Sequence, residues 1–253
     1  MERDGGWRQH RPAKWRNLPE RQATAGHSIG IICIPGVSAL LPGNMQNAST
    51  FSFPVEYKVV KDVSFDQIAC GAPEATEPIV EAARELVAGG ARAVVGACGS
   101  LGHYQRAVAD AVPTPVFMSI MTQVPFILQA LGVRQKLAIL FATKRAFTPL
   151  LREQCGILES DRIISIDLMG CPEFDAFVSP GELCDGDALL KEMFSRVEAQ
   201  IDNTVGALLL QCSDLPPFAA DLQQNLGLPV FDMSGLVEWL HASVVRRPFA
   251  GFL

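Results

Sequence analysis

From residue 28 onward, the hydrophobic pattern alternates between short continuous apolar runs and longer stretches with apolar residues three and four positions apart. The continuous runs, several of them rich in β-branched residues, indicate buried strands, and the spaced positions indicate amphipathic helices. Strands are predicted at residues 28–34, 55–60, 91–97, 115–118, 136–142, 162–167, 205–211 and 229–232. Helices are predicted at residues 76–88, 102–112, 145–155, 187–201 and 216–226. This alternation predicts an α/β fold built from parallel βαβ units.

The two halves of this pattern share one register, which indicates an internal duplication. Cys212 lies 114 residues after Cys98, and the same offset continues through the following helix into the next strand. The matched positions are Leu101 and Leu215, Tyr104 and Phe218, Val108 and Leu222, Val112 and Leu226, and Phe117 and Phe231. We therefore predict two duplicated, doubly wound parallel-sheet lobes related by a pseudo-twofold axis, with the active site between them.

The lobe boundaries follow from the same register. We assign residues 28–120 and 230–253 to lobe one and residues 121–229 to lobe two. Residues 1–27 contain six Arg and Lys side chains and no apolar run. We interpret them as a polar N-terminal extension that the fold does not need.

Cys98 and Cys212 each follow a predicted central strand and precede a predicted helix. Open α/β sheets bind ligands at the carboxyl ends of their strands, so we expect the two thiols to face one cleft from opposite sides. The positive pole of a following helix is expected to lower a thiol pKa, which makes a thiolate available as a base. One thiolate can remove a proton from carbon while the opposite thiol protonates the other face, which inverts a stereocentre without a cofactor.

Five further cysteines have no partner at the repeat offset: Cys33, Cys70, Cys155, Cys171 and Cys184. A free cysteine is usually a small buried hydrophobe, and we interpret these five as structural. The chain has no CxxC motif, and His103 is the only histidine near Cys98 or Cys212 in sequence, so we expect no metal site. We interpret His103 and His241 as structural or surface residues.

Charge and cysteine content limit the partners and the compartment. The net charge of −6 gives no support for binding nucleic acid or an anionic membrane. No apolar run approaches the roughly 18 residues that a membrane-spanning helix needs. Seven cysteines, an odd number in a chain too long to need disulfide staples, favour free thiols in a reducing compartment. We therefore expect a cytoplasmic protein.

Two segments around the paired cysteines resemble the signature loops of the aspartate/glutamate racemase superfamily. They are Gly96-Ala97-Cys98-Gly99-Ser100 and Gln211-Cys212-Ser213-Asp214-Leu215-Pro216-Pro217. The superfamily includes glutamate, aspartate and hydantoin racemases, and maleate isomerases and arylmalonate decarboxylases share its scaffold. The resemblance covers the chain from about Ser28 to its end. It implies two α/β lobes, no pyridoxal phosphate or other cofactor, no metal, and the two cysteines as opposing bases.

By position, the resemblance implies four substrate-binding residues directly after the two cysteines: Gly99, Ser100, Ser213 and Asp214. Their hydroxyl and backbone N–H groups would hold a substrate carboxylate, as helix N-termini do. Pro35 and Gly36 follow the first strand, where glutamate racemases have Asp-Ser, and we expect them at the same cleft. An ionised Asp214 would repel an anion, and Gly99 stands where amino-acid racemases typically have Asn. These departures argue against glutamate as the substrate.

Thr143 and Lys144 end the first strand of the second lobe and are expected to reach the cleft. Lys144 would there bind a second carboxylate, and the alternative is a solvated loop lysine. Asp214 also has an alternative role, as the N-cap of a helix that begins near Pro216.

We interpret the chain as a cofactor-independent racemase or epimerase that acts on a small amino acid or a related carbon acid, hydantoin-like compounds included. One alternative is an isomerase or decarboxylase on the same scaffold, in which the two cysteines have unequal tasks. A second alternative is a non-catalytic protein that binds a small ligand in the duplicated cleft. We expect a small carboxylate or amide as the ligand, neither nucleic acid nor membrane as a partner, and a homo-oligomer.

Overall fold

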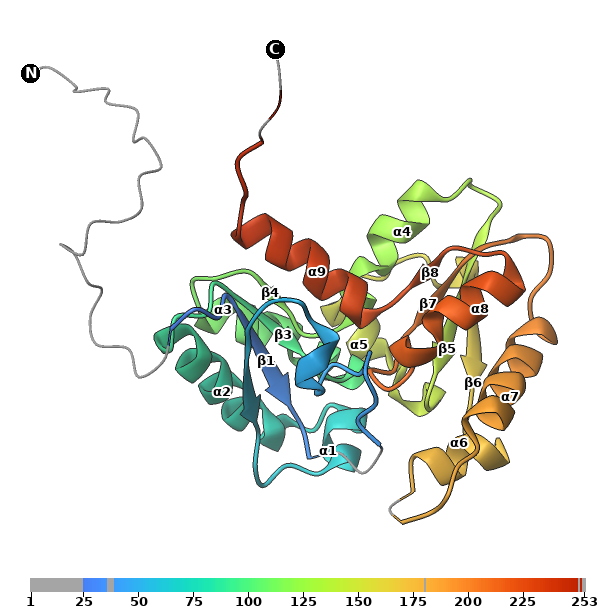
Figure 1. Ribbon diagram of the computed structural model, residues 1–253, viewed down its shortest axis with the longest axis horizontal. Helices are drawn as coiled ribbons and strands as arrows, with labels where there is room; N and C mark the ends of the chain where they lie inside the picture. The colour runs from blue at the N-terminus through green and yellow to red at the C-terminus, as the bar shows by residue number, and fades with distance from the viewer. Residues whose placement is uncertain (1–24, 36–38, 180, 250, 252–253) are drawn as a thin grey trace, which may run out of the picture.

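The computed structural model describes residues 25–35, 39–179, 181–249 and 251, and it contains two four-stranded parallel sheets. The first sheet has the strand order β2-β1-β3-β4 and the second the order β6-β5-β7-β8. The strands of the first sheet are β1 (Ile29–Cys33), β2 (Val55–Val59), β3 (Ala93–Gly96) and β4 (Val116–Phe117). Those of the second are β5 (Lys136–Phe141), β6 (Ile163–Asp167), β7 (Val205–Leu210) and β8 (Val230–Phe231). The predicted α/β fold of two lobes is confirmed, and Figure 1 shows the lobes side by side.

The helices that surround the sheets are mostly short. They are α1 (Phe65–Cys70), α2 (Thr76–Ala88), α3 (Gln105–Ala111), α4 (Val124–Ala130), α5 (Pro149–Gln154), α6 (Pro172–Phe177), α7 (Gly186–Glu198), α8 (Ala219–Leu226) and α9 (Met233–Val244). Within the described ranges, no helix has the length and apolar character needed to cross a bilayer. Four of these helices, α1, α4, α6 and α9, were not predicted from the sequence pattern. Of these, α1 and α6 are too short to show a helical period.

The pairing of the strands repeats at the offset seen in the sequence. In the first sheet Val94 of β3 pairs with Val116 of β4, and in the second Leu208 of β7 pairs with Val230 of β8. Both members of the second pair lie 114 residues after those of the first. The two lobes therefore have the same strand order and the same register around the strands that precede the paired cysteines.

The central strands of each sheet are buried on both faces, which explains the continuous apolar runs. Successive side chains of a strand point to opposite faces, so Ile31 packs in the cluster between the sheets and Ile32 in the cluster under α2. The cluster between the sheets joins the lobes, because it contains residues of β1, β3, β5 and β7 together with α4 and α9. Figure 1 shows α4 and α9 near the junction of the lobes, and α2 and α7 on their outer sides.

The structure refines the expected boundaries at two places. Val230 and Phe231, assigned to lobe one, pair with β7 in the second sheet, and the following helix α9 returns to contact β3. The predicted N-terminal extension lies outside the described residues up to residue 24. Its last residue, His27, belongs to the fold, because its ring contacts the Glu56 carboxylate and, at 3.1 Å, the carbonyl oxygen of Gly89.

Candidate active site

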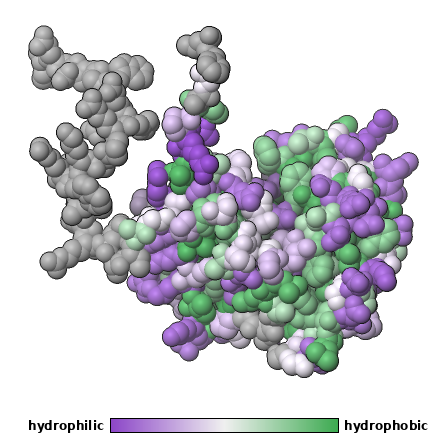
Figure 2. Space-filling view, in the orientation of Figure 1, coloured by the Kyte–Doolittle hydropathy of each residue, from purple (hydrophilic) through white to green (hydrophobic). Residues whose placement is uncertain are grey.

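A cavity of about 290 Å³ lies between the two lobes and is lined by the loops that follow the strands. Lobe one contributes Ile34, Pro35, Leu40, Gln46, Phe65, Ala97 and Cys98. Lobe two contributes Ala142, Thr143, Met169, Phe174, Val178, Cys212, Ser213 and Asp214. Figure 2 shows hydrophobic residues gathered along the boundary between the lobes on this face. The cavity occupies the position at which open α/β sheets bind their ligands.

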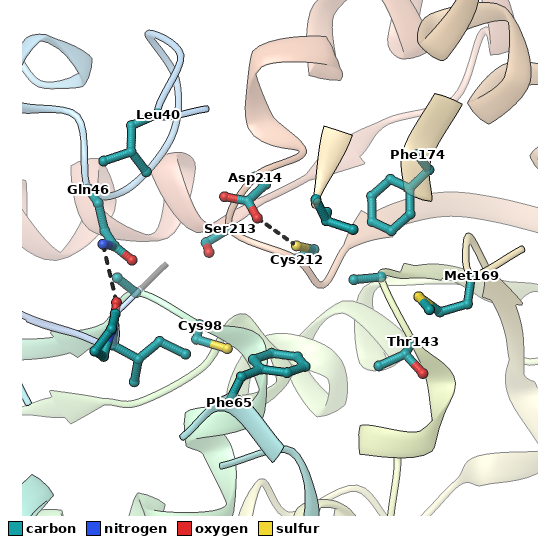
Figure 3. A pocket seen from close by; sticks show the side chains of 15 residues that line it. Leu40, Gln46, Phe65, Cys98, Thr143, Met169, Phe174, Cys212, Ser213 and Asp214 are labelled. Carbon is teal, nitrogen blue, oxygen red and sulfur yellow. Dashed lines mark hydrogen bonds between the residues drawn. The ribbon is translucent and has the colours of Figure 1, made fainter. Parts of the chain in front are cut away.

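Cys98 and Cys212 both line this cavity. Each is the second residue after the carboxyl end of a central strand, β3 for Cys98 and β7 for Cys212. Figure 3 shows the two side chains on opposite walls, with Phe174 and Met169 on one side of them and Leu40 and Gln46 on the other. Both cysteines are free thiols. The structure thus brings together the two thiols that the duplication paired, with space between them for a small molecule.

The environment of Cys98 differs from the expected one. Burial raises the pKa of the Cys98 thiol above its ordinary value, and the negative charge of Asp214 raises it further. The backbone N–H groups of Ser100 and Leu101 and the Ser100 hydroxyl act in the opposite direction. The predicted lowering of this pKa is wrong, because the loss of hydration outweighs the donors of a six-residue 3₁₀ helix at Gly99–Tyr104.

Cys212 has a different set of neighbours. Burial and the charge of Asp214 raise the pKa of the Cys212 thiol well above its ordinary value, and a negative charge on Cys98 adds to this effect. The Cys212 thiol donates to Asp214 Oδ2 at 3.7 Å. The prediction that the following helix lowers the thiol pKa is therefore wrong for Cys212 as well. The pair is chemically unequal. Ser100 and Leu101 donate to the Cys98 sulfur, whereas at Cys212 the opposing donor is the Asp214 backbone N–H, and the Asp214 carboxylate accepts from the thiol.

Asp214 lines the cavity instead of capping a helix. The 3₁₀ helix Pro216–Phe218 begins after Leu215, which makes no side-chain capping bond, so the N-cap role considered for Asp214 is wrong. Asp214 Oδ1 accepts a hydrogen bond from Asn44 Nδ2 of the other lobe. Asn44 is 1% exposed. The sequence carries no signal for this contact, because the two residues are 170 positions apart and Asn44 lies in a loop.

The remaining predicted residues divide into two groups. Pro35, Thr143 and Ser213 line the cavity, as expected from their positions after strands. Lys144 is exposed and is not among the residues that line the cavity, which supports its interpretation as a solvated loop lysine. Gly36 lies outside the described residues.

Gly99 and Ser100 are buried behind Cys98 and do not line the cavity. A Cβ atom at residue 99 would lie 2.2 Å from Gln211 Nε2 and 2.3 Å from the Gln211 carbonyl oxygen. A glycine is therefore needed for the close approach of the two cysteine loops. Ser100 acts on the Cys98 sulfur, so its expected direct contact with substrate is replaced by a contact with the thiol.

Phe65, Met169 and Phe174 form much of the apolar wall and were missed by the sequence pattern. Phe65 is the first residue of α1, which begins with a capping box between Ser64 and Gln67. This Ser-x-x-Gln motif is a helix-start signal that could have placed the aromatic ring. Met169 and Phe174 lie just before and within the short helix α6, where no motif marks them.

Asp214 is the one charged side chain among the described residues that line the cavity. Most of the other lining side chains are aliphatic, aromatic or sulfur-containing. Among the described lining residues, the polar donors are hydroxyl, amide and thiol groups such as Thr143, Ser213 and Gln46. Such a cavity favours a ligand with an apolar or cationic end over a dianion, because a buried dianion without counter-charges is costly.

The two histidines considered in the sequence have structural contacts. His103 is buried, and its ring nitrogens contact the Ser100 carbonyl oxygen at 2.7 Å and Thr148 Oγ1 at 2.8 Å. It thus supports the loop that follows Cys98. His241 stacks on the ring of Phe53.

Three solved enzyme structures have a similar fold. Unliganded arylmalonate decarboxylase has a TM-score of 0.55 at 20% identity and covers 86% of this chain and 92% of its own. Allantoin racemase from Pseudomonas fluorescens has a TM-score of 0.57 at 14% identity, over 88% and 99% of the two chains. Maleate cis-trans isomerase from Nocardia farcinica has a TM-score of 0.56 at 16% identity, over 88% and 94%. The chain therefore shares the two-lobed α/β fold of these three enzymes, which is the fold that the resemblance implied.

Curated relatives have a different activity from the predicted racemase. Dimethylsulfoniopropionate lyase 6 of Emiliania huxleyi is 25% identical over 236 residues, which are 88% of this chain and 61% of the relative. The dimethylsulfoniopropionate lyase of Durusdinium sp. clade D is 26% identical over 234 residues, or 88% and 77%. The chain thus spans about three fifths of the length of the Emiliania enzyme. No family model matches the sequence.

Proposed function

We propose that this protein is a cofactor-independent lyase that removes a proton next to the carboxylate of a small acid and expels a neutral thioether from the adjacent carbon. Dimethylsulfoniopropionate is the proposed substrate. The observation that carries the proposal is the composition of the cavity, in which two thiols and one carboxylate lie among apolar side chains. The relatives named dimethylsulfoniopropionate lyases support the same substrate.

The cavity complements a dialkylsulfonium group. Such a cation is covered by methyl groups and spreads its charge over them, so apolar walls bind it at little cost in hydration. The rings of Phe65 and Phe174 supply aromatic faces, which attract cations. The Asp214 carboxylate supplies the only opposite charge among the described lining residues. A dicarboxylate such as glutamate would meet no cationic side chain among the described lining residues to balance its charge.

The proposed reaction needs one base and no redox partner. The Cys98 thiolate takes the proton from the carbon next to the carboxylate. The electron pair of this C–H bond forms the new C=C bond, and the bond between the neighbouring carbon and sulfur breaks. Its electron pair leaves with the sulfur atom as dimethyl sulfide. Acrylate remains, and the Cys98 thiol returns its proton to water.

Cys98 is the proposed base because its sulfur lies among hydrogen-bond donors. The N–H groups of Ser100 and Leu101 favour its thiolate form. The Asp214 charge favours the protonated form of both thiols, but only Cys212 also donates a hydrogen bond to this carboxylate. The leaving group is neutral, so the reaction needs no acid to protonate it. Cys212 then acts as a neutral wall opposite the base.

The test is to incubate the purified chain with dimethylsulfoniopropionate and to measure dimethyl sulfide and acrylate together. Equimolar release that is lost in Cys98→Ala, with Lys144→Ala unchanged as the control, is expected. Absence of both products from the wild-type chain, in the presence of folded protein, would reject this substrate.

A second candidate, racemisation of a small amino acid or hydantoin-like compound, is favoured by the equivalent placement of the two cysteines in the lobes. It requires both thiols, because each is the base for one enantiomer and the acid for the other. Exchange of the substrate α-hydrogen with deuterium in both enantiomers, without thioether release, would favour it over the lyase.

A further inference from the structure

The loop between β1 and β2 reaches from lobe one across to the Cys212 loop of lobe two. Asn44 at its centre is buried, and its side-chain amide has a defined orientation. The amide oxygen Oδ1 accepts from the Gln46 backbone N–H at 2.7 Å. The amide nitrogen Nδ2 must then face the other way, where it donates to Asp214 Oδ1.

Two further contacts fix the position of Asn44. Its carbonyl oxygen accepts from Thr50 Oγ1 at 2.6 Å. The preceding residue, Gly43, has φ +104° and packs against Pro217, so that a Cβ there would lie 2.9 Å from the Pro217 nitrogen. A side chain at residue 43 would therefore push the loop away from lobe two. The loop is fixed on both sides of the amide that holds Asp214.

The result is a chain of contacts from Asn44 through Asp214 to Cys212. With Oδ1 held by Asn44, Asp214 presents Oδ2 to the Cys212 thiol at 3.7 Å. An ionised carboxylate only accepts hydrogen bonds, so this contact requires the thiol to keep its proton. Figure 3 shows the Asp214 carboxylate directed at Cys212, with Cys98 on the opposite wall.

We propose that Asn44 is a positioning residue: it holds the Asp214 carboxylate against Cys212, so that Cys212 stays a neutral thiol and Cys98 is the sole base. The inference rests on the proposed use of Cys98 as the base. Beside the Asp214 carboxylate, one thiolate in a small apolar cavity is less costly than two.

The charges that act on the two thiols support this assignment. Among the described residues, the titratable groups that act on Cys212 are Asp214 on its own loop and Cys98 on the facing loop. Both charges raise the pKa of Cys212, and the Asp214 backbone N–H acts in the opposite direction. At Cys98 the Ser100 and Leu101 donors oppose the same Asp214 charge.

The test follows the alkylation of each cysteine by iodoacetamide, read by peptide mass spectrometry from pH 6 to pH 10, with the 253-residue chain and no substrate. In the wild type, Cys98 should react faster than Cys212. Asp214→Asn keeps the shape of the side chain but removes its charge, and it should speed the reaction of Cys212 at pH 8 by about tenfold, the effect of one pKa unit. Asn44→Ala should change the Cys212 rate in the same direction.

The matched control is Ser49→Ala, an exposed residue of the same loop that contacts Asn47. It should leave both alkylation rates unchanged, which separates loss of the Asn44–Asp214 contact from a general loosening of the loop. The inference is overturned if Cys212 is the faster cysteine in the wild type, or if Asp214→Asn leaves its rate unchanged while the protein remains folded by circular dichroism. Because no substrate is used, the expected labelling pattern without dimethyl sulfide release would reject the substrate and retain this inference.

Discussion

Gly99 packs directly against the side chain of Gln211, so that a Cβ at residue 99 would lie 2.2 Å from the amide nitrogen. Gly99 follows Cys98 and Gln211 precedes Cys212, and this contact therefore sets the separation of the two cysteine loops. Gln211 is 3% exposed and cannot move aside into solvent. The distance between the two thiols thus depends on the absence of a side chain at residue 99.

Gly99→Ala should therefore lower activity more than it lowers stability. Overpacking of this kind costs about 1–3 kcal/mol of unfolding free energy, and a small shift of a catalytic group costs about a hundredfold in rate. The measurements are urea unfolding and dimethyl sulfide release. Gly186→Ala is the control, because a Cβ there meets no atom within 4 Å. A Gly99→Ala protein with wild-type activity would show that the spacing of the loops is not set by this contact.

Phe65 provides a test of the proposed onium site. Its ring lines the cavity but is 45% exposed, so its replacement should cost little stability. Phe65→Leu keeps an apolar side chain and removes the aromatic face, and it should raise KM for dimethylsulfoniopropionate about tenfold with a smaller change in kcat. Phe126→Leu, a change at a 72% exposed ring that does not line this cavity, is the matched control. Equal KM values for the two variants would argue against an aromatic contact with the cation.

The pH dependence of the rate should reflect the buried base. Burial raises the pKa of the Cys98 thiol above its ordinary value of 9.0, so the thiolate is a minor species at neutral pH. The value of kcat/KM should then rise about tenfold per pH unit up to pH 9, because the fraction of thiolate rises in that proportion. Dimethyl sulfide release is measured from pH 6 to pH 9, with the uncatalysed reaction subtracted. A rate that is flat from pH 6 to pH 8 would mean that the base is already ionised and that the raised pKa is wrong.

These features differ in how far the sequence predicted them. Strands such as β5 are buried on both faces, so the sequence shows them as unbroken apolar runs. The repeat offset between Cys98 and Cys212 predicted that the two thiols face one cavity, and both line it. The protonation state of the thiols could not be predicted from the sequence, because it depends on burial, and burial arises only when the two lobes pack together. A helix end visible in the sequence favoured a lower pKa, and desolvation reverses that effect.

Contacts between loops that are distant in the sequence could not be predicted from it either. Asn44 reaches Asp214 across the lobe boundary through a loop with no periodic pattern. Thr143 and Lys144 are neighbours in sequence, yet the first lines the cavity and the second is exposed. The direction of a side chain at the end of a strand depends on the turn that follows, and the strand pattern does not contain that information.

The most direct test of the account compares Cys98→Ala and Cys212→Ala in one assay with dimethylsulfoniopropionate in deuterated water. Dimethyl sulfide is measured in the gas phase, and deuterium next to the carboxylate is measured by NMR in the remaining substrate. The account predicts that Cys98→Ala loses at least about a thousandfold in thioether release, within the range of a lost general base, and that Cys212→Ala loses clearly less. Full activity in Cys98→Ala, or equal and complete loss in both variants with deuterium exchange in neither, would contradict the assignment of Cys98 as the base.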